Sequence, residues 1–182
     1  MTTQTIARNE SAGSAGFDPT QVVAQSLVAG REVDDFVVNL TGSQKLSEGT
    51  VWCKTATIYV SGASTLWLDK LICEGKVTIH CTSSSFVHIG DLQAANGSIE
   101  VHHGYASSMF LGTVSTPSFT LDVHYSSRLD ILGGAIKKMV GSVTHTSFVR
   151  CLAAIDDLDV WVDKKENRAP YSNPFGSSFI DR

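Results

Sequence analysis

The chain has 182 residues, 42% of them hydrophobic and 18% charged, and a formal net charge of −4. This length suits a single domain, and the absence of any lysine–arginine cluster beyond adjacent pairs argues against a nucleic-acid partner. No apolar run reaches the ~18 residues of a membrane span, and residues 1–16 contain no apolar signal core. We therefore expect a cytoplasmic protein or a component of a particle assembled in the cytosol, such as a virion.

Two segments are expected ahead of the main part of the chain. Residues 1–16 are rich in polar and small residues, so we predict a polar N-terminal tail. Residues 17–30 fit a short helix, in which Asp18 suits the N-cap, Pro19 the first helical position and Gly30 the C-terminal end. This helix would act as a cap on the structure that follows.

An internal repeat fills most of residues 31–163. Its clearest copy, IYVSGASTLWL at 58–68, recurs four times at intervals of 20 to 22 residues, the last time in degenerate form. Apolar and polar residues alternate on both sides of a central serine, as Leu66 and Leu68 do after it. An alignment without gaps places the central serine at Ser64, Ser85, Ser107, Ser127 and Ser147, and the segment VVNLTGS extends the series back to Ser43.

This repeat predicts an all-β fold. Alternation means that each short strand buries one side, and a small residue suits a tight corner between two strands. A third apolar segment, marked by Leu71, Leu92 and Val114, completes a three-sided coil. We predict a single-stranded right-handed β-helix, or β-solenoid, over residues 31–163. A β-sandwich is the alternative, because it also has frequent turns, but only a solenoid requires every coil to match its neighbour.

The segments YVSGASTLWL, HCTSSSFVHI and HHGYASSMFL resemble the V-S-G-A-S-x-L-x-L strands of the auto-transporter adhesin head domain family, often called the GIN domain. The resemblance covers about residues 50–152. It implies a β-helix, suggests a role in surface contact or adhesion, and transfers no catalytic site.

Aromatic residues mark the candidate partner-binding surface. In the predicted register, one outward row contains Trp67, His88 and Phe110, followed by Asp130 and Arg150, and an adjacent row contains Phe86 and Phe148. Residues 164–182 form a C-terminal tail with three further aromatic anchors, which pack on a neighbour or along the molecule itself. The predicted partner-binding residues are Trp67, Phe86, His88, Phe110, Phe148, Tyr171, Phe175 and Phe179.

Catalytic and metal-binding patterns are weak. His80 and His102 share an outward row, but they lack the partners of a metal site, and Glu100 with Asp122, placed in one row, is the best carboxylate pair. We therefore predict no enzyme activity, no metal and no cofactor. The four cysteines fit buried free thiols, although Cys53 and Cys73, twenty residues apart, could form a bridge between coils.

Two functions remain. The first is a structural assembly protein, a rigid solenoid that associates with itself or with other subunits of a viral capsid or a filament. The second is an adhesin-like surface module that binds carbohydrate or a receptor. The aromatic residues of the tail favour the first.

Overall fold

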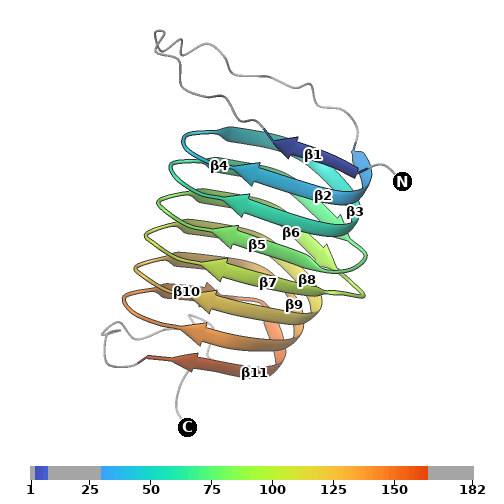
Figure 1. Ribbon diagram of the computed structural model, residues 1–182. Coiled ribbons are helices and arrows are strands. Elements are labelled where there is room, and N and C mark those ends of the chain that lie inside the picture. Colours follow the sequence, from blue (N-terminus) through green and yellow to red (C-terminus); the bar gives the residue numbers. More distant parts are fainter. Residues whose placement is uncertain (1–2, 8–29, 164–182) are drawn as a thin grey trace.

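A stack of parallel strands makes up the computed structural model, which describes residues 3–7 and 30–163 (Figure 1). The stack is a β-solenoid of about seven coils. No helix occurs in these two ranges, so neither contains one that could cross a membrane. The strands are β1 (Thr3–Ala7), β2 (Arg31–Leu40), β3 (Lys45–Val60), β4 (Thr65–Cys73), β5 (Val77–Cys81), β6 (Phe86–Ala94), β7 (Ser98–His103), β8 (Ser108–Val123), β9 (Arg128–Val143), β10 (Phe148–Cys151) and β11 (Ala154–Val162).

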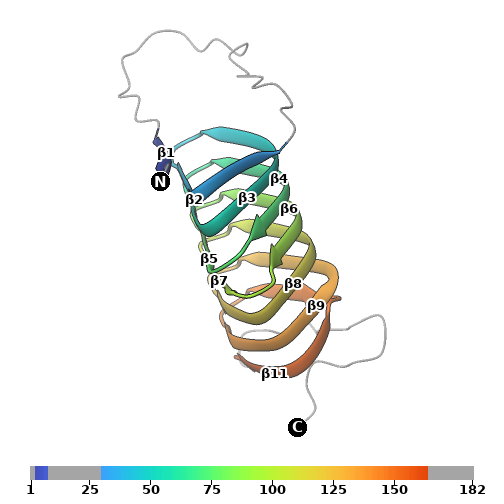
Figure 2. The same ribbon diagram turned by 90° about the vertical axis from the view of Figure 1, so that its right-hand side faces the viewer.

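The register confirms the predicted repeat. Residues that pair between successive coils lie 20 apart in β2 and β3, 21 apart in β4 and β6, and 22 apart in β6 and β8. Figure 2 shows β4, β6, β8 and β9 following one another down one side of the stack. Every described pairing is parallel, whereas a sandwich is built from antiparallel strands, so the sandwich alternative is wrong.

Each coil has three faces, here named from the coil that begins at β4. Face A is 65–68, face B is 70–73 and face C is 77–81, each with its register partners above and below. Asp69 and the equivalent residues of the other coils, such as Gly90 and Gly112, have no register partner between the strands. They form the corner between faces A and B. Glycine is required where this corner packs tightly, because a Cβ on Gly112 would lie 2.2 Å from the backbone oxygen of Gly90.

The core is a set of columns of like residues. Inward residues on one face of successive coils are fully buried, as in the column Leu66, Val87, Met109 and Leu129. Such columns form because coils about 4.8 Å apart bring each side chain onto its counterpart in the next coil. The repeated apolar positions of the sequence are therefore confirmed as the interior of the stack.

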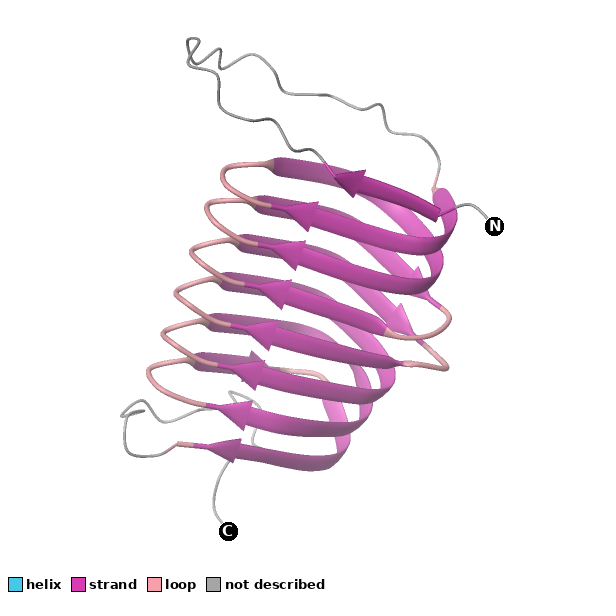
Figure 3. Ribbon diagram, in the orientation of Figure 1, coloured by secondary structure: helices cyan, strands magenta, loops and turns pink. Residues whose placement is uncertain are grey.

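Turns of four residues lead from face C to face A, and they lie one above another along one edge (pink in Figure 3). The second residue of each turn has a left-handed backbone angle, and in three turns the third residue has one too, as with φ of 59° at Ser83 and 62° at Ser84. Ser85 ends this turn and is 2% exposed; its hydroxyl points at Thr82 O, 2.6 Å away, and Val60 O, 2.9 Å away. The central serine of the repeat is thus a buried hydrogen-bond donor as well as a small corner residue.

The serine series begins at Ser64, and its extension to Ser43 is wrong. Lys45 pairs with Thr65, so the residue that lies beside Ser64 is Gln44, whose backbone N–H donates to the Ser64 hydroxyl at 3.2 Å. The first turn has the same four-residue length as the others, so the coil spacing there is 20 and the equivalent of serine is glutamine.

All four cysteines are buried free thiols. Cys53 and Cys73 are register partners on face B, and a contact with Cys73, together with burial, raises the pKa of the Cys53 thiol. Burial also raises the pKa of Cys81 and of Cys151. The hydrogen bond with Cys53 lowers the pKa of Cys73 instead. All four buried cysteines act as small apolar residues of the core.

The N-terminal end of the chain differs from the predicted domain plan in one respect. Strand β1 lies within the predicted polar tail, and it pairs in parallel with β2, Thr3 beside Asp35. The stack therefore extends N-terminal to residue 31. The predicted capping helix lies outside the described residues, except for Gly30, and so does the predicted tail at 164–182.

Candidate functional site

The aromatic strip on face A is the candidate site, and it consists of Trp67, Phe86, His88, Phe110 and Phe148. Three of its rings form one ladder down the stack. The ring centres of Trp67 and His88 are 3.7 Å apart, and those of His88 and Phe110 are 4.9 Å apart, with interplanar angles of 20° and 11°. The predicted outward row is confirmed by the register of β4, β6 and β8.

The other two residues of the strip stand apart from this ladder. Phe86 lies in the adjacent outward row, between Thr65 and Ser108. Phe148 lies in the same row three coils beyond Phe86, where the guanidinium of Arg128 sits 5.6 Å from its ring centre. The strip is therefore continuous from Trp67 to Phe110 and is then interrupted by charged residues.

An ion pair makes this interruption. Asp130 follows Phe110 in the ladder row, and its carboxylate accepts from Arg128 Nε at 2.6 Å. Asp130 is buried, at 7% exposure, so the pair closes the lower end of the apolar region with a satisfied charge. The interruption limits the apolar part of the strip to three coils.

Exposure decides what the strip can contact. Trp67 is 43% exposed and Phe148 36%, while Phe86, His88 and Phe110 are half-buried. Burial lowers the pKa of His88, so the imidazole in the middle of the ladder stays neutral near neutral pH. The strip therefore offers an uncharged, mostly apolar surface, of the kind found at the centre of protein interfaces.

The ring faces of the ladder are covered by other rings. Both faces of His88 are covered, one by Trp67 and the other by Phe110. Stacked rings present their edges to solvent, and ring edges carry the positive part of the aromatic quadrupole. In the same row Ser47 lies next to Trp67 and Asp130 next to Phe110, so the ladder offers little ring face to a flat ligand. A protein surface could pack across the edges of all three rings.

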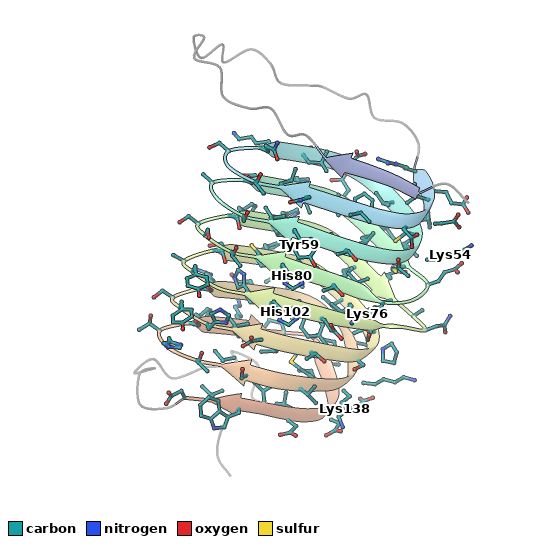
Figure 4. All side chains as sticks on the ribbon, viewed as in Figure 1. Lys54, Tyr59, Lys76, His80, His102 and Lys138 are labelled. Atoms are coloured by element: carbon teal, nitrogen blue, oxygen red, sulfur yellow. The ribbon has the colours of Figure 1, made fainter. Side chains whose placement is uncertain are left out.

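A second ladder occupies face C. Tyr59, His80 and His102 lie one above another in Figure 4, with ring centres 4.5 Å and 4.6 Å apart along the row. Burial and the neighbouring His102 lower the pKa of His80. The repeat predicts the alignment of the two histidines, and the structure adds Tyr59, which is 45% exposed and lies one repeat earlier in the same row.

A third ladder, on the turn edge, was also missed. Tyr105 and Tyr125 stack with ring centres 4.8 Å apart, and Tyr125 lies 4.2 Å from His145. Their signal in the sequence is the spacing of twenty residues at the second position of the turn. Ladders on three sides of the stack indicate that ring stacking between coils is a general device of this fold.

The best carboxylate pair predicted from the sequence is not brought together in one row. Glu100 pairs with Thr120 in one row and His102 with Asp122 in the next, so the prediction that Glu100 and Asp122 share a row is wrong. Glu100 instead holds Lys76 at 2.8 Å. Across residues 3–7 and 30–163, no three His, Cys, Asp or Glu side chains are placed to share a metal ion.

One serine–histidine contact has the chemical partners of a nucleophile and a base. Ser107 Oγ lies 3.1 Å from His103 Nδ1, and His103 Nε2 lies 2.9 Å from Arg128 O. Both residues are fully buried, at 1% and 0% exposure, and burial lowers the pKa of His103. No substrate can reach this pair, so its role is to satisfy polar groups within the core.

A hollow of about 600 Å³ lies on the corner between faces B and C near the N-terminal coils. Among the described residues that line it, the single cation is Lys54, which Asp34 holds at 2.7 Å. The hollow lies away from the aromatic strip and does not extend it. Its lining residues are Glu32, Val33, Asp34, Trp52, Cys53, Lys54, Ile72 and Glu74.

No family model, curated protein or solved structure matches this chain. The remaining predicted partner-binding residues, Tyr171, Phe175 and Phe179, lie outside the described residues.

Proposed function

We propose that this chain is a non-enzymatic structural subunit, a right-handed solenoid rod that associates with copies of itself or with other subunits of a cytosol-assembled particle, such as a viral capsid or a filament. The observation that carries the proposal is the uncharged ladder of Trp67, His88 and Phe110 on face A. The right-handed sense follows the strong general preference of parallel crossover connections.

Two features support a structural role. The coils are joined by parallel ladders along all three faces, which makes the stack a stiff rod with a fixed spacing of surface groups. The buried polar pair of Ser107 and His103 bonds to neighbouring groups of the core and is closed to solvent. The polar chemistry of the interior therefore serves the fold, and the aromatic strip remains for contact with a partner.

The alternative, an adhesin-like module that binds carbohydrate or a receptor, is less well supported for carbohydrate. Aromatic residues that hold sugars present an open ring face, and here the inner ring faces of the ladder are covered. A glycan array tests this alternative directly: binding by the full chain that is lost in Trp67→Ala would favour it over assembly.

Sedimentation tests the assembly proposal. We expect the full chain to sediment well above 19.5 kDa, the mass of one copy. Trp67→Ser should weaken association about tenfold, equivalent to about 1.4 kcal/mol, because it removes the most exposed ring of the ladder. Tyr59→Ser is the matched control, since Tyr59 also stacks on a histidine, is 45% exposed and lies on face C.

Two outcomes would overturn the proposal. One is a full chain that sediments as a single copy at every concentration and in the presence of candidate partner subunits. The other is equal weakening by Trp67→Ser and Tyr59→Ser, which would show that loss of ring stacking, and not loss of the strip, is the cause. Circular dichroism of both variants checks that each remains folded.

A further inference from the structure

The core is left half-covered at the C-terminal end of the stack. Leu158 is an inward residue of the last coil and is 43% exposed, whereas its register partner Met139 is 1% exposed. Val162 is half-buried, whereas its partner Val143 is 2% exposed. The inward residues of the last coil that are more exposed than their buried register partners are Val149, Ile155, Leu158 and Val162.

The chain leaves the stack directly beside this surface. The backbone N–H of Asp163 donates to Val143 O at 3.1 Å, and one coil earlier Thr144 donates to Val123 O at 2.9 Å at the start of a turn. The described part of the chain therefore ends at the turn edge. Segment 164–182 has 19 residues, and the offset between the last two coils, Ala135 to Ala154, is also 19. One further coil of this length would lie across the open end.

The composition of residues 164–182 suits a cap. Tyr171, Phe175 and Phe179 provide apolar side chains for the half-covered surface. Pro170 and Pro174 lack a backbone N–H and therefore hinder the addition of another strand. A terminal coil needs this combination of an apolar inner side and an outer side that stops growth.

Charge also favours this segment over a second copy of the same end. Strand β11 and the residue after it carry four carboxylates, of which Asp157 pairs with Lys138 of β9 at 3.6 Å. The excess of negative charge means that two such ends placed together would repel. Segment 164–182 carries four basic and two acidic residues, a net charge of +2 that complements the end. The carboxylates are Asp156, Asp157, Asp159 and Asp163, and the basic residues are Lys164, Lys165, Arg168 and Arg182.

We propose that residues 164–182 fold back across the C-terminal end of their own solenoid and cap it, with the three aromatic side chains on Leu158, Val162 and their inward neighbours. The cap prevents another solenoid from adding at this end. Tyr171, Phe175 and Phe179, which the sequence pattern predicts to bind a partner, then contact their own chain instead. This inference does not rest on the proposed function of face A.

Hydrogen–deuterium exchange of the β11 amides tests the cap in the full chain. We compare the wild type with a variant that carries Tyr171→Ser, Phe175→Ser and Phe179→Ser, and with a control that carries Ser172→Ala, Ser177→Ala and Ser178→Ala. The β11 amides of the aromatic variant should exchange at least about tenfold faster, because opening β11 would no longer require displacement of a packed cap. The exchange rates of β4 and β6 should stay unchanged. The control should match the wild type.

Equal exchange at β11 in all three proteins would overturn the proposal. Protection of β11 that disappears when the wild type is diluted would also overturn it, because a second copy would then supply the cover. If the triple variant does not fold, Phe175→Ser alone gives the same comparison. Hydrogen exchange at β11 tests the cap, whereas sedimentation of the full chain tests association through face A. Failure of one proposal is therefore distinguishable from failure of the other.

Discussion

Replacement of Ser85 by alanine separates two explanations of the repeated serine. If the turn requires only a small side chain, alanine fits at least as well as serine. If the turn requires a hydroxyl, alanine leaves two buried carbonyls with one donor fewer. The structure supports the second explanation, because Ser85 Oγ points at Thr82 O at 2.6 Å and at Val60 O at 2.9 Å.

The expected loss follows from these contacts. A net hydrogen bond is worth about 0.5–1.5 kcal/mol, and a buried group left without its partner costs about 1–3 kcal/mol. Ser85 is 2% exposed, so water does not replace the hydroxyl. We expect Ser85→Ala to lower the free energy of unfolding by about 1–3 kcal/mol, or about 2–4 °C in Tm for each kcal/mol in a chain of this size.

Urea unfolding followed by circular dichroism measures this change. The midpoint should fall without a change in slope, because the surface exposed on unfolding is the same. Ser84→Ala is the control, since Ser84 is exposed in the same turn, and it should stay within about 0.5 kcal/mol of wild type. A Ser85→Ala protein as stable as wild type would refute the hydroxyl explanation and restore the argument from size.

Three further predictions concern the interior. Burial lowers the pKa of His103, so below about pH 6.5 the unfolded chain binds a proton that the folded chain does not, and the free energy of unfolding falls as pH falls. His103→Val should weaken this pH dependence, as measured by urea unfolding at several pH values. A free energy of unfolding that depends on pH as in the wild type would contradict the prediction. Ile89→Asp should abolish the folded circular dichroism signal, since it places an unpaired carboxylate at a position with 0% exposure. The control Ser115→Asp, on the outward side, should stay folded. A wild-type melting curve for Ile89→Asp would show that the register is wrong. Cys81 and Cys151 should react with a thiol reagent only after unfolding, because burial raises the pKa of both thiols, and rapid labelling of the native protein would count against their burial.

The sequence by itself determined the coil and its rows. Strand residues alternate between two sides, and each coil must match the one beneath it, so a repeated pattern of apolar residues is enough to assign inside and outside. The ladder of Trp67, His88 and Phe110 follows from this counting alone, and so does the inward position of His103, which the alternation places in the column of Val123.

Only the tertiary structure decided the contacts that depend on side-chain direction and on the length of each turn. Gln44 and not Ser43 lies beside Ser64, because the first coil has 20 residues. A serine at position 43 matches the repeat in the sequence, so the sequence alone does not reveal the shorter coil. The separation of Glu100 from Asp122 has the same origin. Only the pairing of β7 with β8 shows that these two residues lie in neighbouring rows and not in one row. The covered ring faces and the hydrogen-bonded serine hydroxyls come from rotamers fixed by the neighbouring coil, which no repeat in the sequence specifies.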